Sequence, residues 1–212
     1  LSAQHEVGQR RDGEVRMIGR TLSAAAPNKL SGSLNFENDL TLRAGQIYAT
    51  TMTDFTVNGK QTPGAKSKLT VEAPAGGSAS QTPLSALAKL TLQAHDVLIK
   101  GVVRQPFGAI TIRSTSGKPE LADSSLLSVS GDGVKVPVGS MINKSQWVYK
   151  VNGLSANQAV DPLSPDVAKL DGSAIDKGIL VEGHGLTLDS QARLEAQAGG
   201  DLLAWEFQKG VG

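Results

Sequence analysis

One five-residue phrase recurs along the chain and restricts its fold more than any other feature. It reads LTLRA at 40–44, LTVEA at 69–73, LTLQA at 90–94, ITIRS at 110–114 and LTLDS at 186–190. The first and third positions are large aliphatic residues, the second is threonine and the fourth is charged or polar. Alternation of this kind predicts a β-strand with one buried face. We therefore expect Leu40 and Leu42 to point inward, and Thr41 and Arg43 to point outward.

The spacing of the phrase predicts how the strands are arranged. The first four copies begin 29, 21 and 20 residues apart, and glycine-rich breaks lie at 73–80, 114–119, 130–133 and 197–201. Short strands that return at about 20 residues predict a parallel β-helix, in which equivalent strands stack about 4.8 Å apart. A β-sandwich is the alternative, but it does not require one phrase to recur at coil spacing. No helical pattern extends beyond about two turns, so the chain is expected to be all-β.

Composition excludes several classes of function. A net charge of +1 with 4% aromatic residues does not fit a nucleic-acid-binding protein. The absence of cysteine excludes disulfides, thiol catalysis and cysteine-based metal sites. No run approaches 18 apolar residues, so we expect no transmembrane helix and no membrane-embedded protein. Because the chain begins with Leu1 rather than Met, we expect a piece of a longer protein.

One segment, from about 141 to 169, interrupts the strand pattern and is interpreted as a long excursion from the β-helix wall. It contains one of the two tryptophans and one of the two tyrosines. In the stretch QWVYK, Trp147 and Tyr149 share a strand face. Exposed aromatic side chains stack on sugars or anchor a partner, so these two residues are candidate partner contacts. The alternative is that they clamp the excursion onto the wall.

A second aromatic group lies near the end of the sequence. In LLAWEF, Leu203, Trp205 and Phe207 share one strand face, with Glu206 opposite. We interpret this face as core packing. The alternative is a stacking surface for a further coil, because the end of a β-helix exposes unpaired edges.

His184 is the candidate catalytic residue that the sequence raises. The phrase GHG at 183–185 is similar to one in polygalacturonase-type β-helix enzymes, in which several carboxylates act as acid and base. Those enzymes also carry Asn-Thr-Asp and Asp-Asp phrases, and this chain has neither. We therefore interpret Gly183 and Gly185 as a turn, with LTLDS as the next strand.

No cofactor-binding or metal site is predicted. His5 and His95 have no ligand spacing to each other or to His184. Aspartates are scattered singly, at Asp123, Asp132, Asp161, Asp166, Asp171, Asp176, Asp189 and Asp201. SGDG at 130–133 and AGGD at 198–201 each occur once, which suits turns better than a calcium-binding repeat.

Four longer stretches together resemble a known family. They are LRAGQIYATTMTDFTVNG (42–59), LSALAKLTLQAHDVLIKGVVRQPFGAITI (84–112), SVSGDGVKVPVGSMINKSQWVY (128–149) and LEAQAGGDLLAWEFQKGVG (194–212). In order and spacing they look like a module of filamentous-haemagglutinin-like large exoproteins, the secreted partners of bacterial two-partner secretion. The resemblance covers about residues 34 to 212. It implies a right-handed parallel β-helix, an interior or C-terminal position, export through an outer-membrane transporter and display on a Gram-negative cell surface.

Residues 1–30 match nothing that we can name. We predict that they form an irregular N-terminal segment, followed by a single β-helix domain over 31–212 with its excursion at 141–169. The expected function is a non-catalytic structural segment of a secreted surface exoprotein that serves adhesion or contact between bacteria. The alternative is a module that binds a glycan or a cell-surface receptor through the excursion. A third hypothesis is a carbohydrate-active β-helix enzyme that uses His184.

Overall fold

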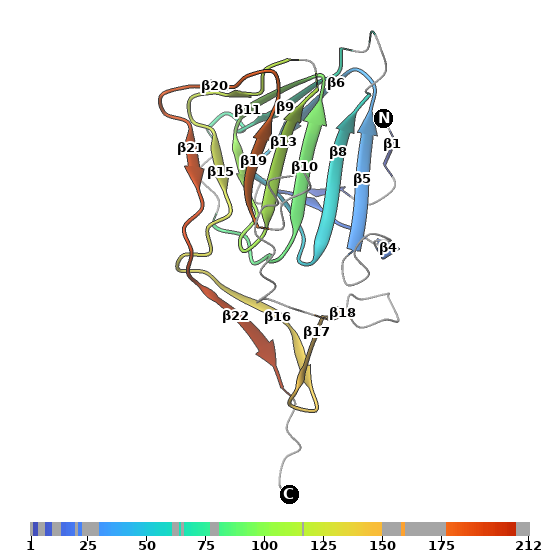
Figure 1. Ribbon diagram of the computed structural model, residues 1–212, viewed down its shortest axis with the longest axis vertical. Coiled ribbons are helices and arrows are strands. Elements are labelled where there is room, and N and C mark those ends of the chain that lie inside the picture. Colours follow the sequence, from blue (N-terminus) through green and yellow to red (C-terminus); the bar gives the residue numbers. More distant parts are fainter. Residues whose placement is uncertain are drawn as a thin grey trace, which may run out of the picture.

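The computed structural model describes residues 2–3, 7–9, 14–19, 21–22, 30–60, 64, 66–76, 81–115, 117–149, 158–159 and 177–206. In these residues the chain is all-β and winds into a parallel β-helix, as the alternation predicts. Three sheets form its walls, and a fourth, smaller sheet projects from it (Figure 1). The β-sandwich alternative is wrong, because sandwich sheets are antiparallel, whereas successive coils pair their wall strands in parallel.

Sheet A is the longest wall. Its parallel strands, in spatial order, are β5 (Leu30–Phe36), β8 (Thr53–Gly59), β10 (Lys89–Ala94), β13 (Ala109–Ser114) and β19 (Gly178–Glu182). The register stacks Phe55 on Leu90 and Leu90 on Ile110. These three side chains are almost completely buried. Each coil therefore covers the aliphatic residues of the previous coil, which is the source of the core.

The other two walls have the same in-register stacking. Sheet C contains β6 (Asp39–Arg43), β9 (Lys68–Glu72), β11 (Asp96–Lys100), β14 (Glu120–Leu121) and β20 (Thr187–Leu188). The parallel part of sheet B contains β3 (Glu14–Met17), β7 (Gln46–Ala49), β12 (Val102–Arg104), β15 (Leu126–Ser128) and β21 (Arg193–Glu195). Inward residues of all three walls meet in one core cluster.

The recurring phrase does not mark one position in the coil. LTLRA, LTVEA and LTLDS contribute to sheet C, whereas LTLQA and ITIRS form strands of sheet A. The expected facing is confirmed, since Leu42 is buried while Thr41 and Arg43 are exposed. Alternation specifies which side chains point inward but not the wall to which a strand belongs, because every wall has the same pleat.

One coil departs from the regular path. Between β9 and β10 no strand of sheet B forms among the described residues, and β7 pairs directly with β12 through Ile47 and Val103. The buried side chain of Gln105 bridges to β7: its Oε1 accepts from the backbone N–H of Ala49, and its Nε2 donates to the Ala49 carbonyl oxygen at 3.3 Å. An amide side chain thus supplies the hydrogen bonds that a strand would have made.

The corner that leads from sheet B into sheet A uses a backbone conformation that is rare for large side chains. Met52, Leu87 and Phe107 occupy equivalent positions in successive coils and have φ angles of 57°, 59° and 57°. A left-handed conformation costs a residue with a Cβ about 1–2 kcal/mol. All three side chains belong to a second apolar cluster outside the main core, and their burial there offsets this cost.

Antiparallel strands close the N-terminal end. β1 (Ser2–Ala3) and β4 (Thr21–Leu22) pair antiparallel with β5, and β2 (Val7–Gln9) pairs antiparallel with β3. Residues 1–30 thus include short strands, and β3 is part of a wall. The division of the chain at residue 30 stays a prediction.

The excursion begins earlier than the sequence suggests. β16 (Lys135–Ile142) and β17 (Gln146–Tyr149) form a hairpin, and β18 (Gln158–Ala159) pairs with β17. β22 (Asp201–Trp205) runs parallel to β16 and completes sheet D. Residues 150–157 and 160–169 of the excursion lie outside the described residues.

Candidate functional site

Sheet D carries the aromatic pair that the sequence singles out. In the β16–β17 hairpin, Met141 faces Trp147. The turn places Asn143 and Lys144 at φ angles of 50° and 58°, a conformation that matches the twist of hairpin strands. Residues 143–146 are exposed, and the hairpin projects from the β-helix in Figure 1. Its tip is therefore accessible to a macromolecular partner.

Trp147 and Tyr149 lie on β17 of this hairpin and are half-buried. Both pack against the second apolar cluster, which includes Met52 and Leu87 from the wall corner. The indole Nε1 of Trp147 donates a hydrogen bond to the backbone oxygen of Val138. These contacts match the interpretation in which the aromatics clamp the excursion onto the wall. Contact of the pair with a partner stays a prediction.

The hydroxyl group of Tyr149 is affected by this packing. Burial raises the pKa of Tyr149 above its usual value, because the charged phenolate loses hydration. A hydrogen bond with Thr51 acts in the opposite direction. The phenol is thus held in its neutral form against the wall.

His184 lies on an exposed bend between β19 and β20. Its backbone N–H donates to the oxygen of Gly117 in the previous coil at 3.1 Å. Gly185 has a φ angle of 138°, which favours glycine. The interpretation of GHG as a turn before a strand is therefore confirmed. In the part of the chain that the structure describes, no group of histidine and carboxylate side chains surrounds His184 with metal-binding geometry.

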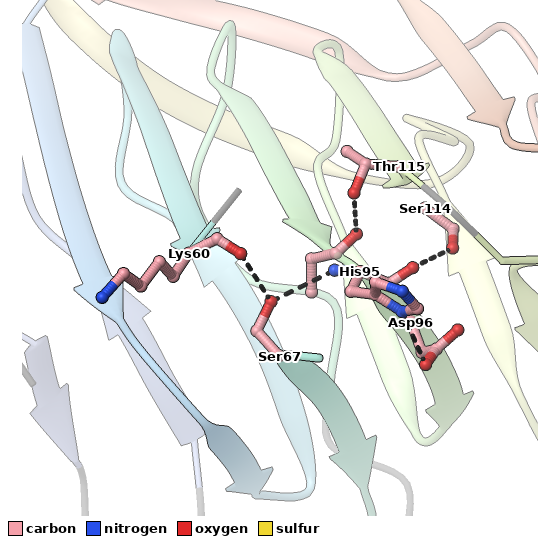
Figure 2. Close-up of polar contacts among 7 residues, drawn as sticks. Lys60, Ser67, His95, Asp96, Ser114 and Thr115 are labelled. Atoms are coloured by element: carbon pink, nitrogen blue, oxygen red, sulfur yellow. Dashed lines mark hydrogen bonds and ion pairs between the residues drawn. The ribbon is translucent and has the colours of Figure 1, made fainter. Parts of the chain in front are cut away.

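A second histidine lies at the equivalent corner of an earlier coil, drawn in Figure 2. His95 Nδ1 is 2.9 Å from Oδ2 of Asp96. Ser67 accepts from the backbone N–H of His95 at 3.2 Å, and Ser114 donates to the His95 backbone oxygen at 2.6 Å. The residue types match a hydrolase triad, but both hydroxyls bond the main chain of His95 rather than its ring. This geometry joins consecutive coils at the corner.

A buried polar cluster on β3, β7 and β12 has no signal in the sequence. Glu14 is buried and accepts hydrogen bonds from Nε2 of Gln46 and, at 3.1 Å, from the hydroxyl of Tyr48. Arg104 Nη1 donates to Oε1 of Gln46 at 3.2 Å. Desolvation lowers the pKa of Arg104, while the nearby carboxylate of Glu195 raises it. Nothing in a sequence distinguishes such buried glutamines from exposed ones.

Three of the scattered aspartates that fall in the described residues, Asp123, Asp189 and Asp201, have side-chain contacts. Asp189 Oδ2 accepts from the backbone N–H of Asp123 at 3.0 Å, and Asp123 Oδ1 accepts from that of Gln191 at 3.1 Å. Asp201 forms an ion pair with Lys135. His5, Phe207 and four of the aspartates, Asp161, Asp166, Asp171 and Asp176, lie outside the described residues.

Comparison with known proteins leaves the chain without an assigned relative. No family model, no curated protein and no solved structure matches it. Within the described residues, no helix has the length and apolar character needed to cross a bilayer.

Proposed function

We propose that the chain is a non-catalytic structural segment of a secreted bacterial surface exoprotein that serves adhesion or contact between bacteria. The observation that supports this proposal best is the in-register stacking of aliphatic residues from coil to coil. A solenoid whose coils contact mainly their neighbours gains length without long-range contacts. Such a chain suits export through an outer-membrane transporter, because each coil can fold on the previous one as it emerges.

Surface display is tested on intact cells of the source organism. Antibodies raised against the purified chain should label unpermeabilised cells, and external protease should remove the epitope while a cytoplasmic marker survives. Labelling that appears only after lysis would overturn the proposed location.

A second candidate function is recognition of a glycan or cell-surface receptor by the hairpin. The observation that favours it is the exposed, projecting tip at residues 143–146. Binding to a glycan array and to intact cells should be compared for the wild type, for a tip variant and for a variant of the aromatic clamp. The tip variant, Lys144→Gly with Gln146→Ala, preserves the left-handed turn. The clamp variant combines Trp147→Ala with Tyr149→Ala.

The outcomes separate these two functions. Binding that is lost in both variants assigns an adhesive site to the hairpin. Binding that survives in both variants contradicts the hypothesis that the hairpin is the binding site.

A separate experiment tests the non-catalytic assignment, for which the chain should leave a polyuronate intact. Shortening of the polymer that disappears in His184→Ala would overturn that assignment.

A further inference from the structure

One joint between coils is held by fewer strand pairs than the joints around it. In sheet B, β7 and β12 pair only through Ile47 and Val103. In the same wall, β3 and β7 pair at four positions, and β12 and β15 pair at three. At the same level of the β-helix, β8 and β10 in sheet A and β9 and β11 in sheet C each pair at five positions. We call the β7–β12 joint the seam.

The seam exists because one coil leaves the wall. The chain departs after Glu72, at the end of β9, and returns at Ala88, before β10. Two glycines of the next coil fit closely against these points: a Cβ on Gly101 would lie 3.0 Å from the Glu72 carbonyl carbon, and a Cβ on Gly108 would lie 2.1 Å from the Ala88 oxygen. Pro83 cannot donate to a strand ladder, so the displaced segment, residues 81–88, is a poor central strand. At this level sheet B is therefore shorter than sheets A and C by one strand spacing, about 4.8 Å.

Side chains replace main-chain hydrogen bonds across the seam. Gln105 accepts the Ala49 N–H on its Oε1 and donates from its Nε2 to the Ala49 oxygen at 3.3 Å. Arg104 Nη1 donates to Oε1 of Gln46 at 3.2 Å. Gln46, Ala49 and Gln105 are completely buried, so these bonds are shielded from solvent while the seam is closed. A long side chain gains rotamer freedom when it lets go, and it can do so without unpairing any strand of sheets A and C.

The displaced segment is bonded to the β7 side of the seam. Gln46 Nε2 donates to the Gln81 oxygen at 2.8 Å, and Ser85 Oγ donates to the Ala49 oxygen at 2.8 Å. The Met52 N–H donates to the Ala86 oxygen at 3.1 Å. When β12 separates from β7, the Ala49 oxygen therefore keeps a partner, and only its N–H loses one. This arrangement lowers the cost of opening, because few buried polar groups are left unpaired.

We propose that the seam is a hinge, at which sheet B opens between β7 and β12 while sheets A and C stay paired. The coil of β7 then tilts away from the coil of β12, and the β-helix bends on that side. Opening exposes Ile47 and Val103, which are completely buried in the closed state. The hinge is a property of the β-helix itself and does not depend on the proposed function.

Thiol labelling of the full chain tests the hinge, because the chain has no cysteine of its own. Val103→Cys places a thiol at the seam. Val97→Cys in β11 is the control in sheet C of the same coil, and Val71→Cys in β9 is the control in the coil before it. All three valines are at most 1% exposed. With excess thiol reagent, Val103→Cys should react at least about tenfold faster than either control, because only the seam opens locally.

The order of the rates separates the hinge from other motions. Fraying from the N-terminal end would label Val71→Cys before Val103→Cys, because β9 lies nearer that end. Labelling at the seam should also depend weakly on urea, since local opening exposes less surface than global unfolding. Equal rates for the three thiols, or an equally steep urea dependence, would overturn the proposal.

Removal of the Gln105 amide should free the seam. Gln105→Leu should raise the labelling rate of Val103→Cys at least about tenfold, because it removes the side-chain bonds to Ala49. Gln93→Leu, on the outer face of sheet A, should leave that rate nearly unchanged. A Gln105→Leu variant that labels no faster would contradict the role of this amide in closing the hinge.

Amide hydrogen exchange of the wild type, followed by NMR, decides the question without any substitution. The Ala49 N–H bonds the Gln105 side chain across the seam, whereas the Ala44 N–H bonds the Glu72 oxygen at 3.0 Å. Both alanines belong to one coil and are at most 2% exposed, so fraying of that coil affects both. After correction for intrinsic rates, Ala49 should exchange at least about tenfold faster than Ala44. Equal protection of the two amides would refute the hinge.

Discussion

Gln105 joins the coils of β7 and β12 where the coil between them forms no described strand of sheet B, so its replacement tests the account of the fold directly. Its amide is completely buried and bonds both the N–H and the carbonyl oxygen of Ala49. Gln105→Leu preserves the approximate volume of the side chain and removes both hydrogen bonds. The substitution therefore separates hydrogen bonding from packing.

The expected loss follows from the partners that remain. Ser85 Oγ still donates to the Ala49 oxygen at 2.8 Å, so the Ala49 N–H alone is left without a partner. A buried unsatisfied donor costs about 1–3 kcal/mol, and a lost hydrogen bond costs about 1 kcal/mol. We expect Gln105→Leu to lower the free energy of unfolding by about 2–4 kcal/mol, a large part of the ~5–15 kcal/mol that stabilises a typical domain.

Urea unfolding followed by circular dichroism measures this loss. The matched control is Gln93→Leu on the outer face, where Nε2 donates to Asn58 Oδ1 at 2.8 Å and the side chain is half-buried. The control should lose less than about 1 kcal/mol, because water can replace that partner. A Gln105→Leu variant no less stable than Gln93→Leu would show that shape alone supports this junction.

Three further predictions test the excursion and the charged residues that face each other on neighbouring strands. Gly139→Ala should lower the free energy of unfolding by about 2 kcal/mol or more, because the φ of Gly139 is 69° and a Cβ there would lie 1.9 Å from the Val148 oxygen. The control is Gly133→Ala, where φ is 67° but the Cβ would point into open space. It should lower the free energy of unfolding by only about 1 kcal/mol in the same urea assay. Because the pKa of Tyr149 is raised in the folded state, its contribution to stability is fully present below pH 10.0, the ordinary value, and is lost as pH rises through the folded pKa. The melting temperature should therefore fall less steeply above pH 10.0 in Tyr149→Phe than in the wild type. Parallel curves for the two proteins would refute the raised pKa of Tyr149. Lys68→Glu places an acid between Asp39 and Asp96, which face it on the neighbouring strands, and should cost about 1 kcal/mol of stability. Lys66→Glu, at an exposed position outside the strand pairs, should be nearly neutral. Equal melting temperatures of the two variants would contradict a stabilising effect of opposite charges at facing positions.

Sequence reasoning predicted the strands and their inward faces but placed two features wrongly. Trp205 was expected in the core, yet it is 65% exposed on β22, because no described strand covers that side of sheet D. The excursion was expected from residue 141, yet sheet D begins at Lys135. The stretch VKVPVG alternates as a wall strand does, so its sequence does not reveal that it leaves the wall.

The candidate site could be predicted only in part. Trp147 and Tyr149 were found from their rarity and their shared face, but their packing onto Met52 and Leu87 depends on corner residues with positive φ. No sequence signal marks a methionine or leucine as left-handed, because both residue types avoid that conformation. At the described corners these side chains pack in the apolar cluster that also contains residues of sheet D.

The sequence by itself determined the period-two pattern, the inward aliphatic columns, the glycine turns and the β-helix. These are local properties, since they depend on the pleat and on the steric freedom of single residues. The tertiary structure decided which wall each phrase joins, which coil lacks a described strand of sheet B and which charges face each other. Those features depend on the register between residues some 20 to 70 positions apart, and register is set only when whole coils pack together.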